Sequence, residues 1–168
     1  MPHFPALPGC LIPMLLLLLT LLAADEPGLY FGSPGGTVTL ADPAVAEGAT
    51  PLTVEFRFKT LEKLKNSYKA VSRWDAQAKD ADRGSFFVEL GASGKIAFGL
   101  LSADGKPKTV TARAAWKDGV WVHVAAVWDG TEARILVDGK KSVGENLEGF
   151  GKLAASKLPL VIGHSPDP

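Results

Sequence analysis

The chain has 168 residues, of which 46% are hydrophobic, and this length suffices for one sizeable core but not for two. The 18 basic residues balance the 18 acidic ones, so no net field favours nucleic acid as a partner. The 18 glycines and 12 prolines punctuate short β-branched and aromatic runs without a fixed period. The composition therefore predicts a single all-β domain.

The N-terminal segment differs in kind from the rest. Residues 11–22 are almost entirely apolar, and two alanines and two acidic residues follow them. This pattern predicts a secretory signal peptide over residues 1–24 and an exported domain over residues 25–168, which is secreted, periplasmic or at the cell surface. The apolar run is shorter than the roughly 20 residues that span a bilayer, so no membrane insertion is expected after cleavage. Cys10, the only cysteine, would leave with the signal.

Strand signals begin after the signal peptide. Residues 29–40 predict a short first strand interrupted by glycines, and residues 52–59 alternate cleanly between apolar and polar side chains. Residues 60–68 are predicted to form a connection, because a helix this short is not stable without packing. A further strand is expected at residues 69–74, followed by a carboxylate-rich polar loop at residues 75–84.

The middle of the chain predicts a hairpin. Residues 85–90 and 95–101 alternate and are separated by Gly91 and Gly94. Another alternating strand is expected at residues 108–114.

Residues 119–140 give the clearest local prediction. Two runs of strand-forming residues, 121–128 and 132–137, flank an Asp-Gly dipeptide, which supplies the positive φ angles of a tight turn. The first run is apolar on both faces, so it is predicted to be a central strand. Residues 144–157 are expected to be mostly loop, and residues 158–163 to form a late strand.

About ten short strands predict an antiparallel β-sandwich, in which two stacked sheets shield one another. The W-x-H-V-A…D-G…V-D-G pattern at residues 121–139 and the L-x-I-G pattern ending at Gly163 resemble laminin-G-like and pentraxin-like domains. These belong to the concanavalin A-like lectin/glucanase superfamily, and the resemblance covers residues 29–163. It implies a concanavalin A-like jelly roll.

The resemblance also implies what this chain lacks. Family domains continue after I-G into a final strand that pairs with the first one. The jelly roll is therefore expected to lack its last strand, which a C-terminal segment of a longer polypeptide or a partner strand would supply. The family's intersheet disulfide has no counterpart, because its positions fall on Glu55 and Ala125.

The carboxylates of the chain do not form a catalytic pattern. Related glucanases place an E-x-D-x-E run along one strand, and hydrolysis needs two such carboxyl groups, but this chain has no such run. Asp80, Asp82, Glu145 and Glu148 are interpreted as solvated loop charges, and His123 as a structural residue of the family motif. The chain is therefore not expected to be an enzyme.

Calcium is the one metal that the resemblance raises. Pentraxins bind it through oxygen ligands from two loops. The matching positions here lie near Asp82 and Arg83 and at residues 165–167. Only Asp82 and Asp167 offer carboxylates, so the resemblance implies at most a weak calcium site, and the alternative is an ordinary polar loop. No other cofactor is expected.

Two tryptophans are candidates for ligand contact, because lectin-type surfaces hold sugar rings against aromatic faces. Trp74 and Trp116 both lie next to predicted loops, and a buried anchoring role is the alternative for each. The sequence therefore predicts a non-catalytic module that binds glycan or protein ligands as part of a larger polypeptide. A carbohydrate-active enzyme of the same fold and a purely structural accessory domain stay open as alternatives.

Overall fold

The computed structural model describes residues 29–31, 36–40, 51–75, 77–78 and 84–163. The chain divides into two units, Met1–Tyr30 and Phe31–Pro168, and every described strand lies in the second. In the described part of the chain, no helix is long and apolar enough to cross a membrane. The predicted signal peptide at residues 1–24 lies outside the described residues.

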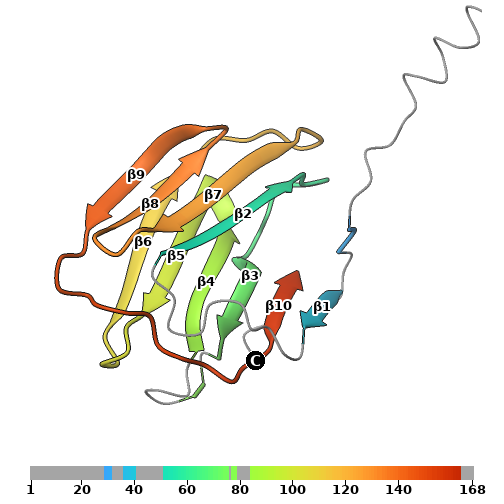
Figure 1. The fold of residues 1–168 in the computed structure, drawn as a ribbon. Helices are drawn as coiled ribbons and strands as arrows, with labels where there is room; N and C mark the ends of the chain where they lie inside the picture. Colours follow the sequence, from blue (N-terminus) through green and yellow to red (C-terminus); the bar gives the residue numbers. More distant parts are fainter. Residues whose placement is uncertain (1–28, 32–35, 41–50, 76, 79–83, 164–168) are drawn as a thin grey trace, which may run out of the picture. The chain divides into compact units, whose positions relative to one another are not determined.

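Ten strands among the described residues form two antiparallel sheets (Figure 1). The six-stranded sheet has the order β1 (Thr37–Leu40), β10 (Leu160–Gly163), β3 (Tyr68–Trp74), β4 (Gly84–Gly91), β5 (Lys95–Leu101) and β6 (Pro107–Arg113). The four-stranded sheet has the order β2 (Leu52–Phe58), β7 (Val122–Trp128), β8 (Glu132–Val137) and β9 (Lys140–Asn146). A short 3-10 turn, Ala92–Gly94, joins β4 to β5. The predicted antiparallel β-sandwich is confirmed.

The β4–β5 hairpin has the pairing that its alternation predicted. The inward residues of the two strands lie opposite one another in the pairs Phe86 with Leu100, Val88 with Phe98 and Leu90 with Ile96. Successive side chains of a strand point to opposite faces, so these three pairs share one face. All six side chains are buried in the core.

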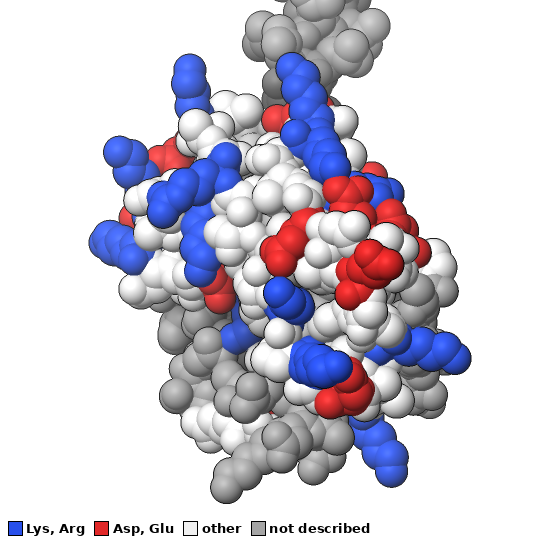
Figure 2. Space-filling view, turned by 90° about the vertical axis from the view of Figure 1, so that its left-hand side faces the viewer, with Lys and Arg blue, Asp and Glu red and all other residues white. Residues whose placement is uncertain are grey.

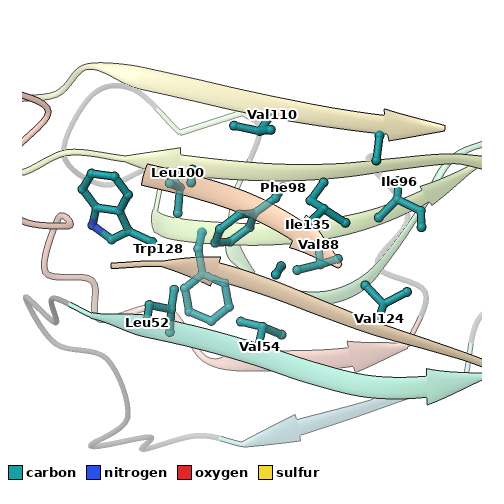
Figure 3. Packing of buried hydrophobic residues seen from close by; sticks show 14 of the residues in the cluster. Leu52, Val54, Val88, Ile96, Phe98, Leu100, Val110, Val124, Trp128 and Ile135 are labelled. Carbon is teal, nitrogen blue, oxygen red and sulfur yellow. The ribbon is translucent and has the colours of Figure 1, made fainter. Parts of the chain in front are cut away.

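The core lies between the two sheets (Figure 3). Phe98 of the six-stranded sheet and Trp128 and Ile135 of the four-stranded sheet are fully buried. Burying one such side chain stabilises the fold by roughly 1.5–3 kcal/mol. The segment that follows β9 adds Leu147 and Phe150, and the Phe150 ring contacts Trp128 edge to face at 5.4 Å.

The β7–β8 hairpin confirms the clearest sequence prediction. β7 pairs with both β2 and β8, so it is an interior strand. At the turn, the Asp129 carboxylate accepts hydrogen bonds from the backbone N–H groups of Thr131 (3.0 Å) and Glu132 (2.8 Å). Gly130 has a φ of 101°, which a residue with a side chain rarely adopts. The Asp-Gly dipeptide therefore fixes this turn.

Several sequence predictions of element bounds were wrong, most of them by one or two residues. The predicted loop at residues 144–157 begins inside β9, which pairs with β8 although Lys140 and Lys141 are poor strand formers. Backbone pairing at an exposed edge overrides intrinsic propensity there. The first strand is limited to Thr37–Leu40 among the described residues, and Gly84 belongs to β4 instead of the preceding loop.

Two positions singled out by the family resemblance lie in one sheet. Glu55 and Ala125, which stand at the positions of the family disulfide, lie opposite one another between β2 and β7. β1 pairs with β10. The expectation that the jelly roll lacks its last strand concerns the chain after Gly163, outside the described residues, and it stays a prediction.

The surface carries charges of both signs. Figure 2 shows one side of the molecule, where basic and acidic side chains lie next to one another. Strands β6, β8 and β9 contribute ion pairs of this kind: Lys108 with Glu145 (3.3 Å), Arg134 with Asp129 (2.5 Å) and Lys141 with Glu132. Exposed pairs of this kind are worth little stability, so the core dominates the stability of the fold.

A candidate ligand-binding face on the six-stranded sheet

The candidate site is built around Phe87, whose side chain points away from the core. Its neighbour Phe86 is buried between the sheets, and alternation along β4 turns Phe87 to the outer side of the six-stranded sheet. Phe87 lies opposite Ser72 of β3 and Gly99 of β5. A Cβ atom built at Gly99 would lie 2.0 Å from Cε1 of Phe87, so the Phe87 ring lies directly over this glycine.

Trp74, one of the two predicted ligand residues, contacts Phe87. It ends β3, and its ring centroid lies 5.1 Å from that of Phe87 with an interplanar angle of 73°. Both residues are half-buried, and neither belongs to the core cluster. We call these two rings the Trp74–Phe87 pair. Edge-to-face contact fixes their mutual orientation and leaves aromatic surface on the outer side of the sheet.

Charged and polar groups surround the Trp74–Phe87 pair. Lys69 is buried, and its Nζ lies 5.7 Å from the Phe87 ring centroid. Glu89, two residues along β4 and on the same side as Phe87, accepts a hydrogen bond from Lys95 at 3.1 Å. Thr109 is exposed and lies opposite Gly99 in β6. This face therefore combines an aromatic surface with ammonium, carboxylate and hydroxyl groups.

Trp116, the second predicted ligand residue, has different surroundings. It packs against the core cluster and meets Phe58 edge to face, with a centroid distance of 5.1 Å and an interplanar angle of 88°. It is half-buried, and its local packing is that of an anchor at the border of the core.

The structure does not bring the two predicted tryptophans together. Trp74 lies opposite Gly84 at one end of the β3–β4 ladder. Trp116 follows Ala114, whose N–H donates to the Gly94 carbonyl at the turn beyond the other end of β4. Trp74 and Trp116 therefore mark opposite ends of the six-stranded sheet.

The predicted calcium ligands cannot be placed. Asp82 and Asp167 both lie outside the described residues. Within the described ranges, no group of three or more His, Cys, Asp or Glu residues is arranged to hold a metal ion. The weak calcium site stays a prediction.

Among the described carboxylates, Asp129 and Glu132 lie close together, because both contact Nη1 of Arg134, whereas Glu89 and Glu145 lie on different sheets. Glu89 is on β4 and pairs with Lys95, whereas Glu145 is on β9 of the other sheet and pairs with Lys108. Glu145 was predicted to be in a loop, so that assignment was wrong, and Asp80 lies outside the described residues.

His123 is engaged in contacts within the four-stranded sheet. Its Nε2 lies 2.7 Å from Oε1 of Glu55, and its backbone N–H donates to the Asp138 carboxylate at 3.0 Å. These contacts tie β7 to β2 and to the turn after β8.

Sequence reasoning did not single out Phe87. Two adjacent aromatic residues on one strand must point to opposite faces, so the Phe86-Phe87 dipeptide was the available signal. Trp121 was missed as well, and its ring lies beside Arg57 (5.5 Å from Cζ) and Lys59 (5.0 Å from Nζ).

Comparisons with known proteins place this fold in a family. The laminin G family model described as the concanavalin A-like lectin/glucanases superfamily matches residues 31–168. The chain therefore belongs to this superfamily. No curated protein matches its sequence.

Three solved structures illustrate the similarity. Domains LG4-5 of the mouse laminin α1 chain match with a TM-score of 0.60 and 19% identity, covering 82% of this chain and 33% of that one. The binding domain of Paraclostridial mosquitocidal protein 1 matches with a TM-score of 0.60 and 11% identity, covering 77% and 33%. The botulinum neurotoxin serotype G binding domain matches with a TM-score of 0.53 and 15% identity, covering 79% and 37%. At these identities the similarity shows the fold alone, and this chain spans about a third of each of those chains.

Proposed function

We propose that this domain is a non-catalytic binding module whose ligand is a glycan held against the Trp74–Phe87 pair. The observation that carries the proposal is the position of this pair: two half-buried rings in edge contact, outside the core cluster, on the outer side of the sheet. Sugar CH groups pack on aromatic faces, while sugar hydroxyls need polar partners nearby. Membership of a lectin/glucanase superfamily supports the glycan class.

The groups around the pair supply the polar partners. Lys95 and Thr109 can donate to sugar oxygens, and the Glu89 carboxylate can accept from sugar hydroxyls. The aromatic surface consists of two half-buried rings, so a single sugar ring would be held weakly, and we expect a chain of several sugar units to bind better.

A pair of alanine substitutions tests the proposal. Trp74→Ala should abolish saturable binding on a glycan array, because it removes one of the two rings that form the aromatic surface. Trp116→Ala is the matched control: it removes a tryptophan that packs on the core border, so it should lower the melting temperature while glycan binding survives.

The controls separate folding from binding. Circular dichroism of both variants should keep the β-sheet spectrum of the wild-type chain. Unchanged glycan binding by a folded Trp74→Ala variant would overturn the site, and binding lost only in Trp116→Ala would move it to the other end of the sheet.

Three other functions have distinct outcomes in the same experiment. A purely structural accessory domain predicts no saturable binding to any glycan on the array. A carbohydrate-active enzyme predicts measurable turnover of a polysaccharide, which would need two converging carboxyl groups. A protein ligand predicts no binding to any glycan on the array. It also predicts a protein partner whose binding is lost in the Trp74→Ala variant.

We propose further that the chain is exported, as the predicted signal peptide at residues 1–24 implies. It would then act outside the cytoplasm as one module of a longer polypeptide, or with a partner strand that completes its sheet.

A further inference from the structure

Two loops, each of which connects the two sheets, meet at one end of the sandwich and are joined by hydrogen bonds. One loop follows β2 and the other precedes β7, and they lie together in Figure 1. The Gly119 N–H donates to the Thr60 carbonyl at 2.7 Å, and the Thr60 hydroxyl donates to the Asp118 carboxylate at 2.8 Å. We call residues 59–65 and 117–121 the basic tip.

The basic tip is anchored by side chains that pack against the core. Leu64 packs against the core cluster, as does Trp116, which lies just before the second loop. In that loop the Val120 N–H donates to the Lys117 carbonyl at 3.2 Å, and Gly119 has a φ of 76°, so residues 117–120 form a tight turn. Packing at its base and hydrogen bonds between its loops therefore hold the tip in place.

The basic tip exposes apolar side chains. Five large hydrophobic residues are exposed in the described part of the chain, and two of them, Leu61 (66%) and Val120 (51%), lie on this tip. Trp121, next to Val120, is half-buried. Exposed apolar side chains gathered at one place mark an interaction surface more often than scattered ones do.

The charge of the basic tip is positive although the chain as a whole is neutral. Residues 59–65 and 117–121 contain four lysines and two acidic residues, and the Asp118 carboxylate already accepts a hydrogen bond from Thr60. Arg57 and Lys59 both lie beside the Trp121 ring, at 5.5 Å and 5.0 Å from its centroid. Two cations are thus gathered at an aromatic ring next to exposed Val120.

We propose that the basic tip docks on an anionic lipid surface. Leu61 and Val120 enter the boundary between headgroups and acyl chains, Trp121 lies at the headgroup level, and Lys59 and Lys117 meet the anionic headgroups. Tryptophan favours this interface, and a buried apolar face combined with lysines is the arrangement that binds bilayers peripherally. The basic tip follows Trp116, at the end of the six-stranded sheet opposite to Trp74, and it shares no residue with the Trp74–Phe87 pair.

Co-flotation of the full chain with vesicles tests the proposal. The chain should float with vesicles of phosphatidylcholine containing about 30% phosphatidylglycerol and should not float with pure phosphatidylcholine. Each lysine near an anionic surface contributes about fivefold to partitioning, so the double variant Lys59→Gln/Lys117→Gln should lose about 25-fold. Raising the salt concentration should weaken binding in the same direction.

Matched variants separate the apolar and the basic contributions. Leu61→Ser/Val120→Ser should also release the chain from anionic vesicles, because it removes the apolar side chains without changing the charge. Lys152→Gln and Leu40→Ser, which alter an exposed lysine and an exposed leucine elsewhere, should leave vesicle binding unchanged.

Three results would overturn the proposal. The first is equal flotation with neutral and anionic vesicles, and the second is flotation that the Leu61→Ser/Val120→Ser variant retains. The third is preferential binding to a soluble sulfated polysaccharide that this same variant retains, because a soluble polyanion needs the lysines but not the exposed apolar side chains.

Discussion

Gly99 is the residue that allows Phe87 to lie flat on the outer side of the sheet. Only 2.0 Å separates Cε1 of Phe87 from the position that a Cβ atom of residue 99 would take, so the ring leaves no room for a side chain beneath it. We expect Gly99→Ala to force the Phe87 ring off the sheet at a cost of about 1–3 kcal/mol, and to weaken glycan binding while Trp74 is unchanged. Chemical denaturation and glycan titration measure the two effects.

Gly36→Ala is the control for that substitution. A Cβ at Gly36 would lie 3.7 Å from the nearest atom, in the Phe31 ring, which is ordinary contact. Gly36→Ala should therefore leave glycan binding unchanged, and normal glycan binding by Gly99→Ala would show that the Phe87 ring is not part of the site.

Asp129 makes the stability of the β7–β8 hairpin depend on pH. Hydrogen bonds from the Glu132 and Thr131 N–H groups and from Arg134 lower the pKa of Asp129 from its ordinary value of 3.8 to about 2. A carboxyl group with a lowered pKa stabilises the fold above its unfolded pKa and loses this contribution as the pH falls through its folded pKa. The contribution is thus complete above about pH 4 and is lost toward about pH 2.

The Asp129→Asn variant isolates this dependence. It lacks the ionised carboxylate, so its melting temperature should be below that of the wild type above about pH 4. The gap between the two should close as the pH falls from about 4 to about 2. Melting curves in that range measure it, and a gap independent of pH would contradict the assignment.

At the scale of elements, the β4–β5 turn requires the backbone of Gly94 to lie close to the backbone of Ala114. Gly94 has a φ of 74°, and a Cβ there would lie 2.0 Å from the Ala114 carbonyl oxygen. Gly105 has a similar φ of 81°, but nothing lies within 4 Å of its Cβ position. The two glycines share the backbone strain and differ only in the clash.

This difference predicts unequal costs for the same substitution. Gly105→Ala should destabilise the fold by about 1–2 kcal/mol, the cost of a left-handed conformation. Gly94→Ala should cost distinctly more, because the backbone at Ala114 must move and its hydrogen bond to Gly94 is lost. Equal free energies of unfolding for the two variants would show that the backbone at Ala114 moves away from residue 94 without a measurable cost.

Alternation along the chain was enough to predict the elements that bury one face. The β4–β5 register follows from the pattern of Phe86, Val88 and Leu90, and the β7–β8 turn follows from its Asp-Gly dipeptide. β9 was missed although the Asp138-Gly139 dipeptide joins it to β8, because its polar sequence, with Lys140, Lys141 and Glu145, lacks the residues that favour strands. Local signals thus predicted the hairpins whose two strands are both apolar, but not the one whose second strand is polar.

The candidate sites show the same limit more strongly. Trp74 was found because tryptophan near a loop is a known ligand residue, but its contact with Phe87 depends on β3 lying beside β4. The cations beside Trp121 come from the end of β2 and the residue after it, far earlier in the chain. Sites built between strands that are distant in sequence require the sheet order, which residue types alone do not provide.

At the scale of the whole molecule, the described core belongs to the second of the two units. Among the described residues, the core cluster draws its buried side chains from Leu52 to Leu153, and none comes from the unit Met1–Tyr30. Cleavage near Ala24 should therefore leave the fold intact. N-terminal sequencing of the exported protein should begin at Asp25, and its melting temperature should lie within about 3 °C of that of the uncleaved chain.

Two results would contradict this prediction of cleavage without loss of the fold. A chain recovered outside the cell with Met1 still attached would refute the signal peptide. Loss of a cooperative melting transition on cleavage would mean that the first unit contributes to the core.

The place of β10 in the six-stranded sheet has a consequence for biosynthesis. β10 lies between β1 and β3, so the described partner of β1 is a strand made near the other end of the chain. While the ribosome is still translating β9, the described partner of Thr37–Leu40 has not yet been made. Closing so long a loop is slow, because its entropy is lost before the contacts form. Among the described strands, the first to be made is thus the last to gain its partner, and a chaperone or a delay in translation would act on that unpaired segment.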